Sequence, residues 1–350
     1  MVGESYDGGP VAALRRIGFL LERGREDTYK VRAFRGAAAA ILPLSDDELR
    51  SRMADGTLTD LPGVGASSAT VIRAALAGEL PERLAALEEE HGGPLTEGGH
   101  ELRAQLRGDL HSHSDWSDGG SPIEEMAFTA MELGHEYQVL TDHSPRLRVA
   151  NGLSADRLRR QLGVIDAVNQ HLSSGGEGGF TLLKGIEVDI LDDGSLDQID
   201  ELLDQLDVRV ASVHSKLKMD APDMTRRMVA AVRNPRVNVL GHCTGRMVMG
   251  ARGVRQQSQF DARAVFAACA ASDTAVEINS RPERRDPPTK LLELARDLGC
   301  LFSIDSDAHA PGQLDFLWYG AERAEAAGID PDRIVNTWPR ERLLTWANPE

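Results

Sequence analysis

Histidine is the residue type whose placement in this chain points most directly to chemistry. Of ten histidines, six stand at or just after short apolar runs: His111, His113, His143, His214, His242 and His309. Three carboxylates occur in the same segments: Asp118, Glu187 and Asp307. Neutral imidazole and carboxylate are common ligands of zinc, manganese and iron. A single histidine at the end of a strand is more often a hydrogen-bonded structural residue, but six together favour metal binding.

Nine such ligands are too many for one tetrahedral or octahedral ion. They suit two or three divalent ions, Mn, Zn or Fe, that share a bridging carboxylate. The pairs His111/His113 and Asp307/His309 have a spacing of two residues, which places both side chains on one face if a strand continues through them. We therefore expect a site that hydrolyses phosphoesters with a hydroxide formed from water bridging two cations.

Further polar residues near these segments are candidates for roles in catalysis. Asp142 precedes His143, where it could bind an ion, cap a helix or hold a neighbouring ligand in place, and we favour the last role. Contacts to the substrate phosphate are expected from basic residues that follow the proposed ligand segments, namely Lys216, Arg246 and Arg281. Lys218 is expected to be a solvated charge, and a surface position is expected for His91, His100, His135 and His171.

The segments that carry these residues alternate with longer helical stretches, which indicates parallel βα units. Seven strands are expected at 108–111, 137–142, 181–190, 208–214, 237–242, 275–279 and 301–305. In a βα barrel the active site forms at the C-terminal ends of the strands, so the polar residues there would converge. Seven strands rather than eight predict a distorted TIM-like α/β barrel.

The N-terminal part of the chain has a different pattern of apolar residues. Apolar residues at spacings of three and four predict helices over 11–23, 29–42, 45–54 and 66–77. We expect a helical domain over 1–90, a linker over 91–106 that is rich in glycine and glutamate, and the barrel over 107–350. The turn Leu61-Pro62-Gly63-Val64-Gly65 precedes the fourth helix, so its backbone amides could bind a nucleic-acid phosphate.

The motifs of the barrel region resemble those of the PHP (polymerase and histidinol phosphatase) superfamily. The matching motifs are Asp109-Leu110-His111-Ser112-His113, Thr141-Asp142-His143, Gly185-Ile186-Glu187, Val213-His214-Ser215, the segment 241–246 and Ser306-Asp307-Ala308-His309. The resemblance implies a distorted seven-stranded barrel and three ion sites. One ion would be bound by His111, His113, Glu187 and Asp307, a second by Glu187, His214 and His242, and a third, near the leaving oxygen, by Asp118, His143 and His309.

The helical region resembles the 8-kDa helix-hairpin-helix module of bacterial family X DNA polymerases, through residues 29–38 and the turn at 61–65. The short linker leaves no room for a polymerase palm. The resemblance implies that DNA is contacted by Lys30, Arg32, Arg35, Gly63, Val64 and Gly65. Abasic-site lyase activity is not expected, because the helix over 66–77 contains no lysine and Val71 stands near the position of the Schiff-base lysine.

Composition narrows the class of protein. Lys plus Arg total 39 against 55 for Asp plus Glu, a net charge of −16, so the bulk surface should repel nucleic acid outside local cationic sites. Three well-separated cysteines, no signal-peptide pattern at the N-terminus and no long apolar run favour a cytoplasmic protein without a membrane span.

Three functions remain open on these observations. The favoured one is a metal-dependent 3′-to-5′ exonuclease acting on single-stranded or gapped DNA. The second is a phosphomonoesterase for small molecules, such as a histidinol-phosphate or nucleotide phosphatase. The third is a non-catalytic nucleic-acid-binding adaptor, which the full set of ligands disfavours because a structural barrel has no need of them.

Overall fold

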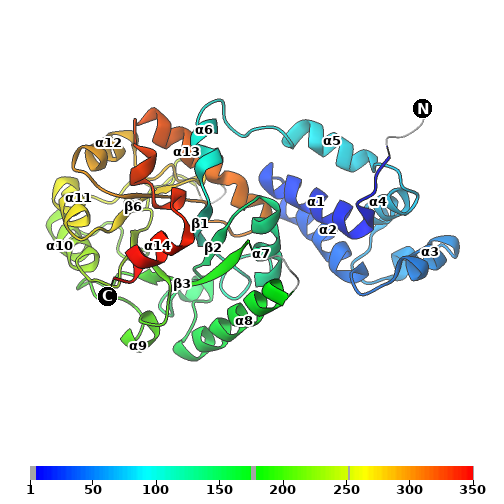
Figure 1. Ribbon diagram of the computed structural model, residues 1–350, viewed down its shortest axis with the longest axis horizontal. Coiled ribbons are helices and arrows are strands. Elements are labelled where there is room, and N and C mark those ends of the chain that lie inside the picture. The colour runs from blue at the N-terminus through cyan, green and yellow to red at the C-terminus, as the bar shows by residue number, and fades with distance from the viewer. Residues whose placement is uncertain (1–4, 175–178, 251–252, 350) are drawn as a thin grey trace. The chain divides into compact units, whose positions relative to one another are not determined.

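The computed structural model describes residues 5–174, 179–250 and 253–349 (Figure 1). The chain forms two compact units, which divide between Leu95 and Thr96. Within the described ranges, none of the helices is long and apolar enough to cross a membrane.

The N-terminal unit is helical. Its elements are α1 (Gly9–Arg23), α2 (Thr28–Ile41), α3 (Asp46–Ala54), a short 3₁₀ turn (Leu58–Asp60), α4 (Ala66–Leu76) and α5 (Glu82–His91). Helix α3 begins with a capping box, in which the Ser45 side chain and the Glu48 side chain each satisfy a backbone amide. The four expected helices are present, and α5 continues through the glutamate run because its apolar residues Leu84 and Leu87 are buried.

The C-terminal unit contains one sheet of seven parallel strands in sequence order. The strands are β1 (Gly108–Ser112), β2 (Tyr137–Leu140), β3 (Thr181–Asp189), β4 (Val208–Ser212), β5 (Val239–Leu240), β6 (Ala275–Asn279) and β7 (Phe302–Asp305). A parallel bridge between Ser112 and Ala308 joins the two edges beyond β1 and β7. The expected seven-stranded TIM-like barrel is therefore confirmed.

Helices pack around this sheet. They are α6 (His100–Gln105), α7 (Ile123–Glu132), α8 (Ala155–Ser174), α9 (Asp200–Leu203), α10 (Ala221–Val232), α11 (Ala262–Ala271), α12 (Thr289–Asp297), α13 (Leu317–Ala326) and α14 (Arg340–Ala347). Helix α6 lies within the range expected to be a linker. Apolar faces such as Met126 of α7 and Met224 of α10 pack in the main core with Ile186 of β3. A second cluster joins the strands to the C-terminal segment through Trp338 and Leu343. This packing leaves the C-terminal ends of the strands to carry polar groups.

The surface position expected for His135 is wrong. His135 lies between α7 and β2 with 5% of its surface exposed. Neither of its ring nitrogens has a hydrogen-bond partner among the residues that the structure describes. Burial, together with the nearby charge of Arg103, lowers the pKa of His135 to about 3. The turn between α7 and β2 is packed inward, which local polarity did not indicate.

His135 should make the protein sensitive to acid. Its pKa is about 3 in the fold against 6.5 as the ordinary value, so the unfolded chain binds the extra proton between these values. Stability present above pH 6.5 is therefore lost as the pH falls toward 3, by up to about 1.4 kcal/mol per pH unit. We expect His135→Asn to remove this part of the loss. Denaturant unfolding of the wild type and of His135→Asn at pH 7 and pH 5 measures the loss of unfolding free energy, with the exposed His171→Asn as the control. Equal losses in the wild type and in His135→Asn would contradict the role of His135.

Candidate metal centre

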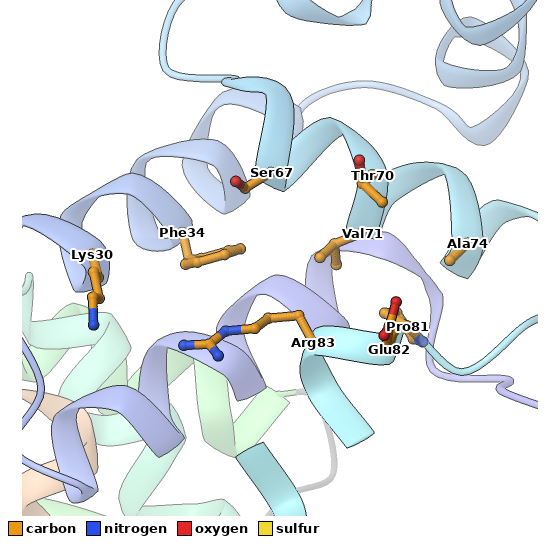
Figure 2. Close-up of a pocket in the computed structure, with 9 residues that line it drawn as sticks. All are labelled: Lys30, Phe34, Ser67, Thr70, Val71, Ala74, Pro81, Glu82 and Arg83. Atoms are coloured by element: carbon orange, nitrogen blue, oxygen red, sulfur yellow. The ribbon is translucent and has the colours of Figure 1, made fainter. Parts of the chain in front are cut away.

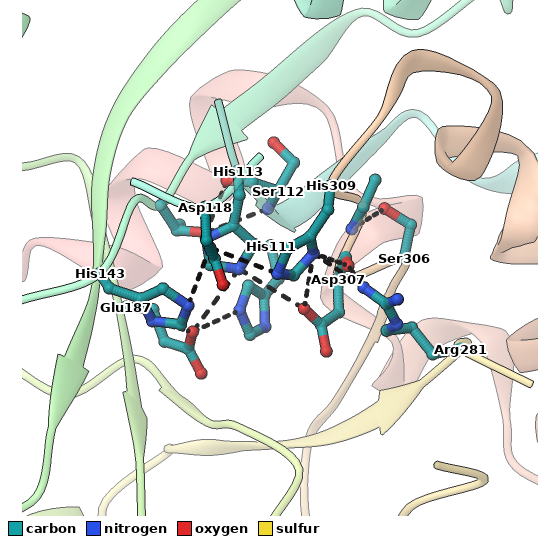
Figure 3. Close-up of polar contacts among 12 residues, drawn as sticks. His111, Ser112, His113, Asp118, His143, Glu187, Arg281, Ser306, Asp307 and His309 are labelled. Atoms are coloured by element: carbon teal, nitrogen blue, oxygen red, sulfur yellow. Dashed lines mark hydrogen bonds and ion pairs between the residues drawn. The ribbon is translucent and has the colours of Figure 1, made fainter. Parts of the chain in front are cut away.

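The ends of the strands bring all nine expected metal ligands into one cluster. Figure 3 shows the side chains of His111, His113, Asp118, His143, Glu187, Asp307 and His309 turned toward one another. His214 follows β4 and His242 follows β5, and both side chains approach Glu187. Residues far apart in the sequence meet here because parallel strands end at the same side of the barrel.

Glu187 of β3 lies at the centre of the cluster and is 1% exposed. Its Oε2 atom is 2.8 Å from His143 Nδ1 and 3.3 Å from His111 Nε2. Its Oε1 atom is 2.8 Å from His242 Nε2 and 3.2 Å from His214 Nε2. Burial by itself would raise the pKa of Glu187, but the imidazoles around it hold the pKa well below its usual range. An ionised carboxylate whose two oxygens face different histidines has the geometry of a bridging ligand.

Within this cluster, three sets of described side chains bring their ligand atoms within 4.8 Å of one another. They are His111 with His113 and Glu187, then His143 with Glu187 and His214, and finally His113 with Asp118, His143 and His309. These sets overlap with the groups that the family resemblance implies, but His143 lies close to Glu187 as well as to Asp118. Asp307 Oδ1 is 3.4 Å from His113 Nε2, near the first set.

The chemistry of the donor set fits divalent cations. Several buried donor atoms have no hydrogen-bond partner within the described ranges: His111 Nε2, both ring nitrogens of His113 and His214, His143 Nδ1, His242 Nδ1 and Glu187 Oε2. Buried polar atoms are rarely left unpaired in proteins, and ligation would satisfy these. Burial, with a further contribution from His309 and His143, lowers the pKa of His113 to about 3, which keeps this imidazole in the neutral form that binds metals.

Two buried aspartates support the cluster. Asp142 accepts hydrogen bonds from the backbone and side chain of Ser114 and from the side chains of Ser117 and Gln161. These bonds fix the segment that leads to Asp118. Asp189 accepts a 3.1 Å bond from the backbone N–H of His214 and lies 3.4 Å from its Nδ1 atom. Sequence analysis did not single out Asp189, although it follows Glu187 at the i+2 spacing.

The basic residues expected near the phosphate are placed differently from one another. Lys216 forms an ion pair with Asp192 at an exposed position. Arg246 donates to the backbone carbonyls of residues 284 and 285. Arg281 donates to the carbonyl oxygen of Asp307 at 2.9 Å and approaches the ring of His309 (Figure 3).

Arg284 is a further basic residue at the site, which sequence analysis missed. Its Nε atom donates to Asp307 Oδ2 at 3.0 Å. Although burial acts to lower the pKa of Arg284, the carboxylates of Asp307 and Glu187 raise it overall. The run Arg281 to Arg285 in the sequence was the available signal, but local pattern does not tell which of its arginines turns inward.

A cavity of about 480 Å³ opens over the cluster. Several of the expected ligand residues line it, together with Arg255 and Arg284. Apolar residues from three loops line it as well: Leu147, Val149, Ala150, Val213, Leu217 and Met247. A volume of this order accommodates a small organic phosphoester or the end of a polymer.

The expected DNA-binding turn of the N-terminal unit has the geometry of a tight hairpin. Gly63 has a φ of +91°, which favours glycine, and a Cβ there would lie 3.2 Å from the carbonyl oxygen of Gly36. Val64 is buried, and Gly65 is the N-cap residue of α4. The Gly65 amide donates to the Ser68 hydroxyl, so phosphate binding would rely on amides of the following turn.

The expected basic contacts of α2 are only partly exposed. Arg32 is exposed, whereas Lys30 forms an exposed ion pair with Glu26. Arg35 forms a bidentate pair with Glu22 that joins α2 to α1, so a phosphate contact would have to replace this pair. Side chains of α2, α4 and the start of α5 surround a pocket of about 460 Å³, which includes Lys30, Phe34, Val71 and Arg83 (Figure 2).

Comparison with known proteins connects this geometry to a family. The PHP domain family matches residues 109–281, which include His111, Glu187 and His242. This chain contains a PHP domain. Members of this family are metal-dependent hydrolases of phosphoesters, the class of enzyme that the sequence predicts for this chain. The grouping of individual ligands remains a prediction.

The proteins that are similar to this chain are named as a DNA polymerase/exonuclease and as phosphatases. The chain is 37% identical over 232 residues to the DNA polymerase/3′-5′ exonuclease PolX of Bacillus subtilis, a match that covers 66% of this chain and 39% of that protein. It is 27% identical over 245 residues to a probable phosphatase of Syntrophotalea carbinolica, covering 67% of this chain and 92% of the relative. A histidinol phosphate phosphatase from Lactococcus lactis was solved with zinc, L-histidinol and phosphate. It has 18% identity to this chain and a TM-score of 0.46, and the match covers 64% of this chain and 95% of that chain.

Proposed function

We propose that this PHP domain protein is a metal-dependent phosphodiesterase that removes nucleotides from DNA ends as a 3′-to-5′ exonuclease. The observation that carries the proposal is the cavity over the cluster of expected ligands, whose lining combines arginines with apolar side chains. The N-terminal helical unit would contribute affinity for the DNA backbone.

The walls of the cavity suit a nucleotide better than histidinol phosphate. Arg255 and Arg284 provide positive charge for phosphate groups, while Leu147, Leu217 and Met247 provide an uncharged surface for a base or sugar. Among the described residues that line the cavity, the carboxylates are Asp118 and Asp307, both of which are expected metal ligands. The ammonium group of histidinol would therefore lack an anionic partner of its own.

The direction of cleavage is inferred from a similar protein. The name of the Bacillus subtilis relative includes a 3′-5′ exonuclease, and this chain spans 39% of that protein. We extend the polarity to the present chain because its match includes the metal-binding motifs.

In the proposed reaction the protein residues bind and orient the phosphoester. When bound, two or three divalent cations would lower the pKa of water and neutralise charge on the phosphoryl oxygens. Arg284 is held by Asp307 close enough to contact a nonbridging oxygen, and Arg281 is held by the carbonyl of the same residue. The apolar side chains that line the cavity would limit the access of water to the ester. Asp118 and His309, 3.4 Å apart, lie where a leaving oxygen could be stabilised.

The protein should hydrolyse DNA ends more efficiently than histidinol phosphate. We expect Mn²⁺-loaded protein to shorten 5′-labelled single-stranded DNA into a ladder, and to hydrolyse histidinol phosphate with a kcat/KM at least about tenfold lower, since an unpaired ammonium beside cations costs about 1.4 kcal/mol or more. Product ladders on gels and phosphate release measure the two activities.

Controls separate the alternatives. Protein treated with EDTA should be inactive on both substrates and regain activity with Mn²⁺. Faster hydrolysis of histidinol phosphate would overturn the proposal in favour of a small-molecule phosphatase. Release of phosphate from nucleoside monophosphates without shortening of DNA would indicate a nucleotide phosphatase, and ladders from 3′-labelled DNA alone would reverse the polarity.

A further inference from the structure

Strand β6 supplies none of the nine expected ligands, yet it directs polar side chains at the metal centre. Glu277 and Asn279 are two residues apart, so both side chains lie on one face of the strand. Glu277 is 0% exposed and Asn279 is 1% exposed. A carboxylate is costly to bury, so its partners indicate its role.

The partners of Glu277 are two expected metal ligands from other strands. Its Oε1 atom lies 2.6 Å from His111 Nδ1. Its Oε2 atom accepts the backbone N–H of His242. Asn279 extends the same layer, because its side-chain amide donates to Glu277 Oε2 at 3.2 Å and to Asp307 Oδ2 at 3.1 Å.

The other ring nitrogen of His111 faces the cluster. His111 Nε2 lies 3.3 Å from Glu187 Oε2 and has no hydrogen-bond partner in the part of the chain that the structure describes. A carboxylate at Nδ1 accepts a hydrogen bond from Nδ1–H, which keeps the ring proton on Nδ1 and leaves the lone pair on Nε2. Nε2 is therefore the atom that can bind a cation.

We infer that Glu277 is a positioning residue for the metal centre, which holds His111 in the tautomer that binds metal and fixes the backbone of His242. One buried carboxylate thereby orients ligands from β1 and β5 at once. The inference rests on the metal centre of the proposed function, but it does not depend on the choice of substrate.

Glu277→Gln tests the role with nearly unchanged side-chain volume. Glutamine has one acceptor oxygen, so either His111 Nδ1–H or the His242 amide would face an amide NH₂ group. If the glutamine NH₂ turns to His111, the ring must carry its proton on Nε2, which blocks ligation. We expect Zn²⁺ or Mn²⁺ affinity to fall by about 10- to 100-fold, the usual effect of removing a group that orients a ligand.

The measurement is metal affinity, by calorimetric titration of metal-free protein against a competing chelator, with bound metal counted by elemental analysis. Thermal unfolding of the metal-free proteins checks the fold. Glu136→Gln is the matched control, because the Glu136 side chain is 43% exposed and pairs with Arg107 away from the ligands. Its metal affinity should equal that of the wild type.

Each outcome bears on the inference. Wild-type affinity and stoichiometry in Glu277→Gln would overturn it. If that variant does not fold, Glu277→Asp keeps the charge but withdraws the carboxylate from His111, and it should show the same loss of affinity. Failure of both variants to fold would indicate a purely structural role and also overturn the inference. Absence of metal binding by the wild type would instead overturn the proposed function.

Discussion

Replacing His111 or Asp307 by alanine should abolish hydrolysis of DNA and of small phosphodiesters. Both side chains are buried in the cluster, His111 facing Glu187 and Asp307 facing His113. Removal of a group that merely orients a metal ligand costs about 10- to 100-fold, so loss of a ligand should cost at least about 100-fold. Both residues stand at strand ends rather than in the apolar core, so the fold should largely persist.

Initial rates with single-stranded DNA and with bis(p-nitrophenyl) phosphate measure this loss, and circular dichroism measures the fold. His171→Ala and Asp193→Ala make the same chemical changes at exposed positions and should retain wild-type rates. Turnover that is unchanged in either His111→Ala or Asp307→Ala would refute the assignment of that residue to the metal centre.

Deleting residues 1–95 should separate DNA affinity from catalysis. The boundary follows the division between the two compact units, and all nine expected metal ligands lie in the C-terminal unit. Loss of about three phosphate contacts, from α2 and the turn before α4, should weaken binding of single-stranded DNA and reduce the slope of log K against log salt by about 2. Hydrolysis of bis(p-nitrophenyl) phosphate should remain.

Titration of labelled single-stranded and gapped DNA at several salt concentrations measures both quantities. A Lys30→Ala/Arg32→Ala double variant should show part of the effect, whereas Arg226→Ala, at an exposed position of α10, is the matched control. Equal affinities and equal salt slopes for the full chain and the deletion would remove the DNA-binding role of the helical unit. The small-molecule phosphatase would then become the better hypothesis.

Local sequence pattern was sufficient to predict the seven strands and the nine side chains that gather at their ends. Alternation of short apolar runs with helical stretches predicts β1 to β7, because a strand buried between helices needs continuous apolar residues and its end can carry polar ones. Polar residues such as Glu187 and His242 could be assigned to one centre from position alone, since parallel strands all end on the same side of a barrel. The i, i+2 spacing of His111 and His113 indicated a shared face.

What the tertiary structure decided is which groups touch. The pairing of Glu277 with His111, the position of His143 between two ligand sets, and the choice of Arg284 rather than Arg246 to meet Asp307 depend on strand register and loop paths. The burial of His135 depends in the same way on how the turn after α7 packs. Such contacts join residues far apart in the chain, so no local spacing encodes them. The sequence by itself determined which side chains are available as ligands and which barrel gathers them. The partners of each ligand follow from packing, because the neighbours of a side chain are set by long-range geometry.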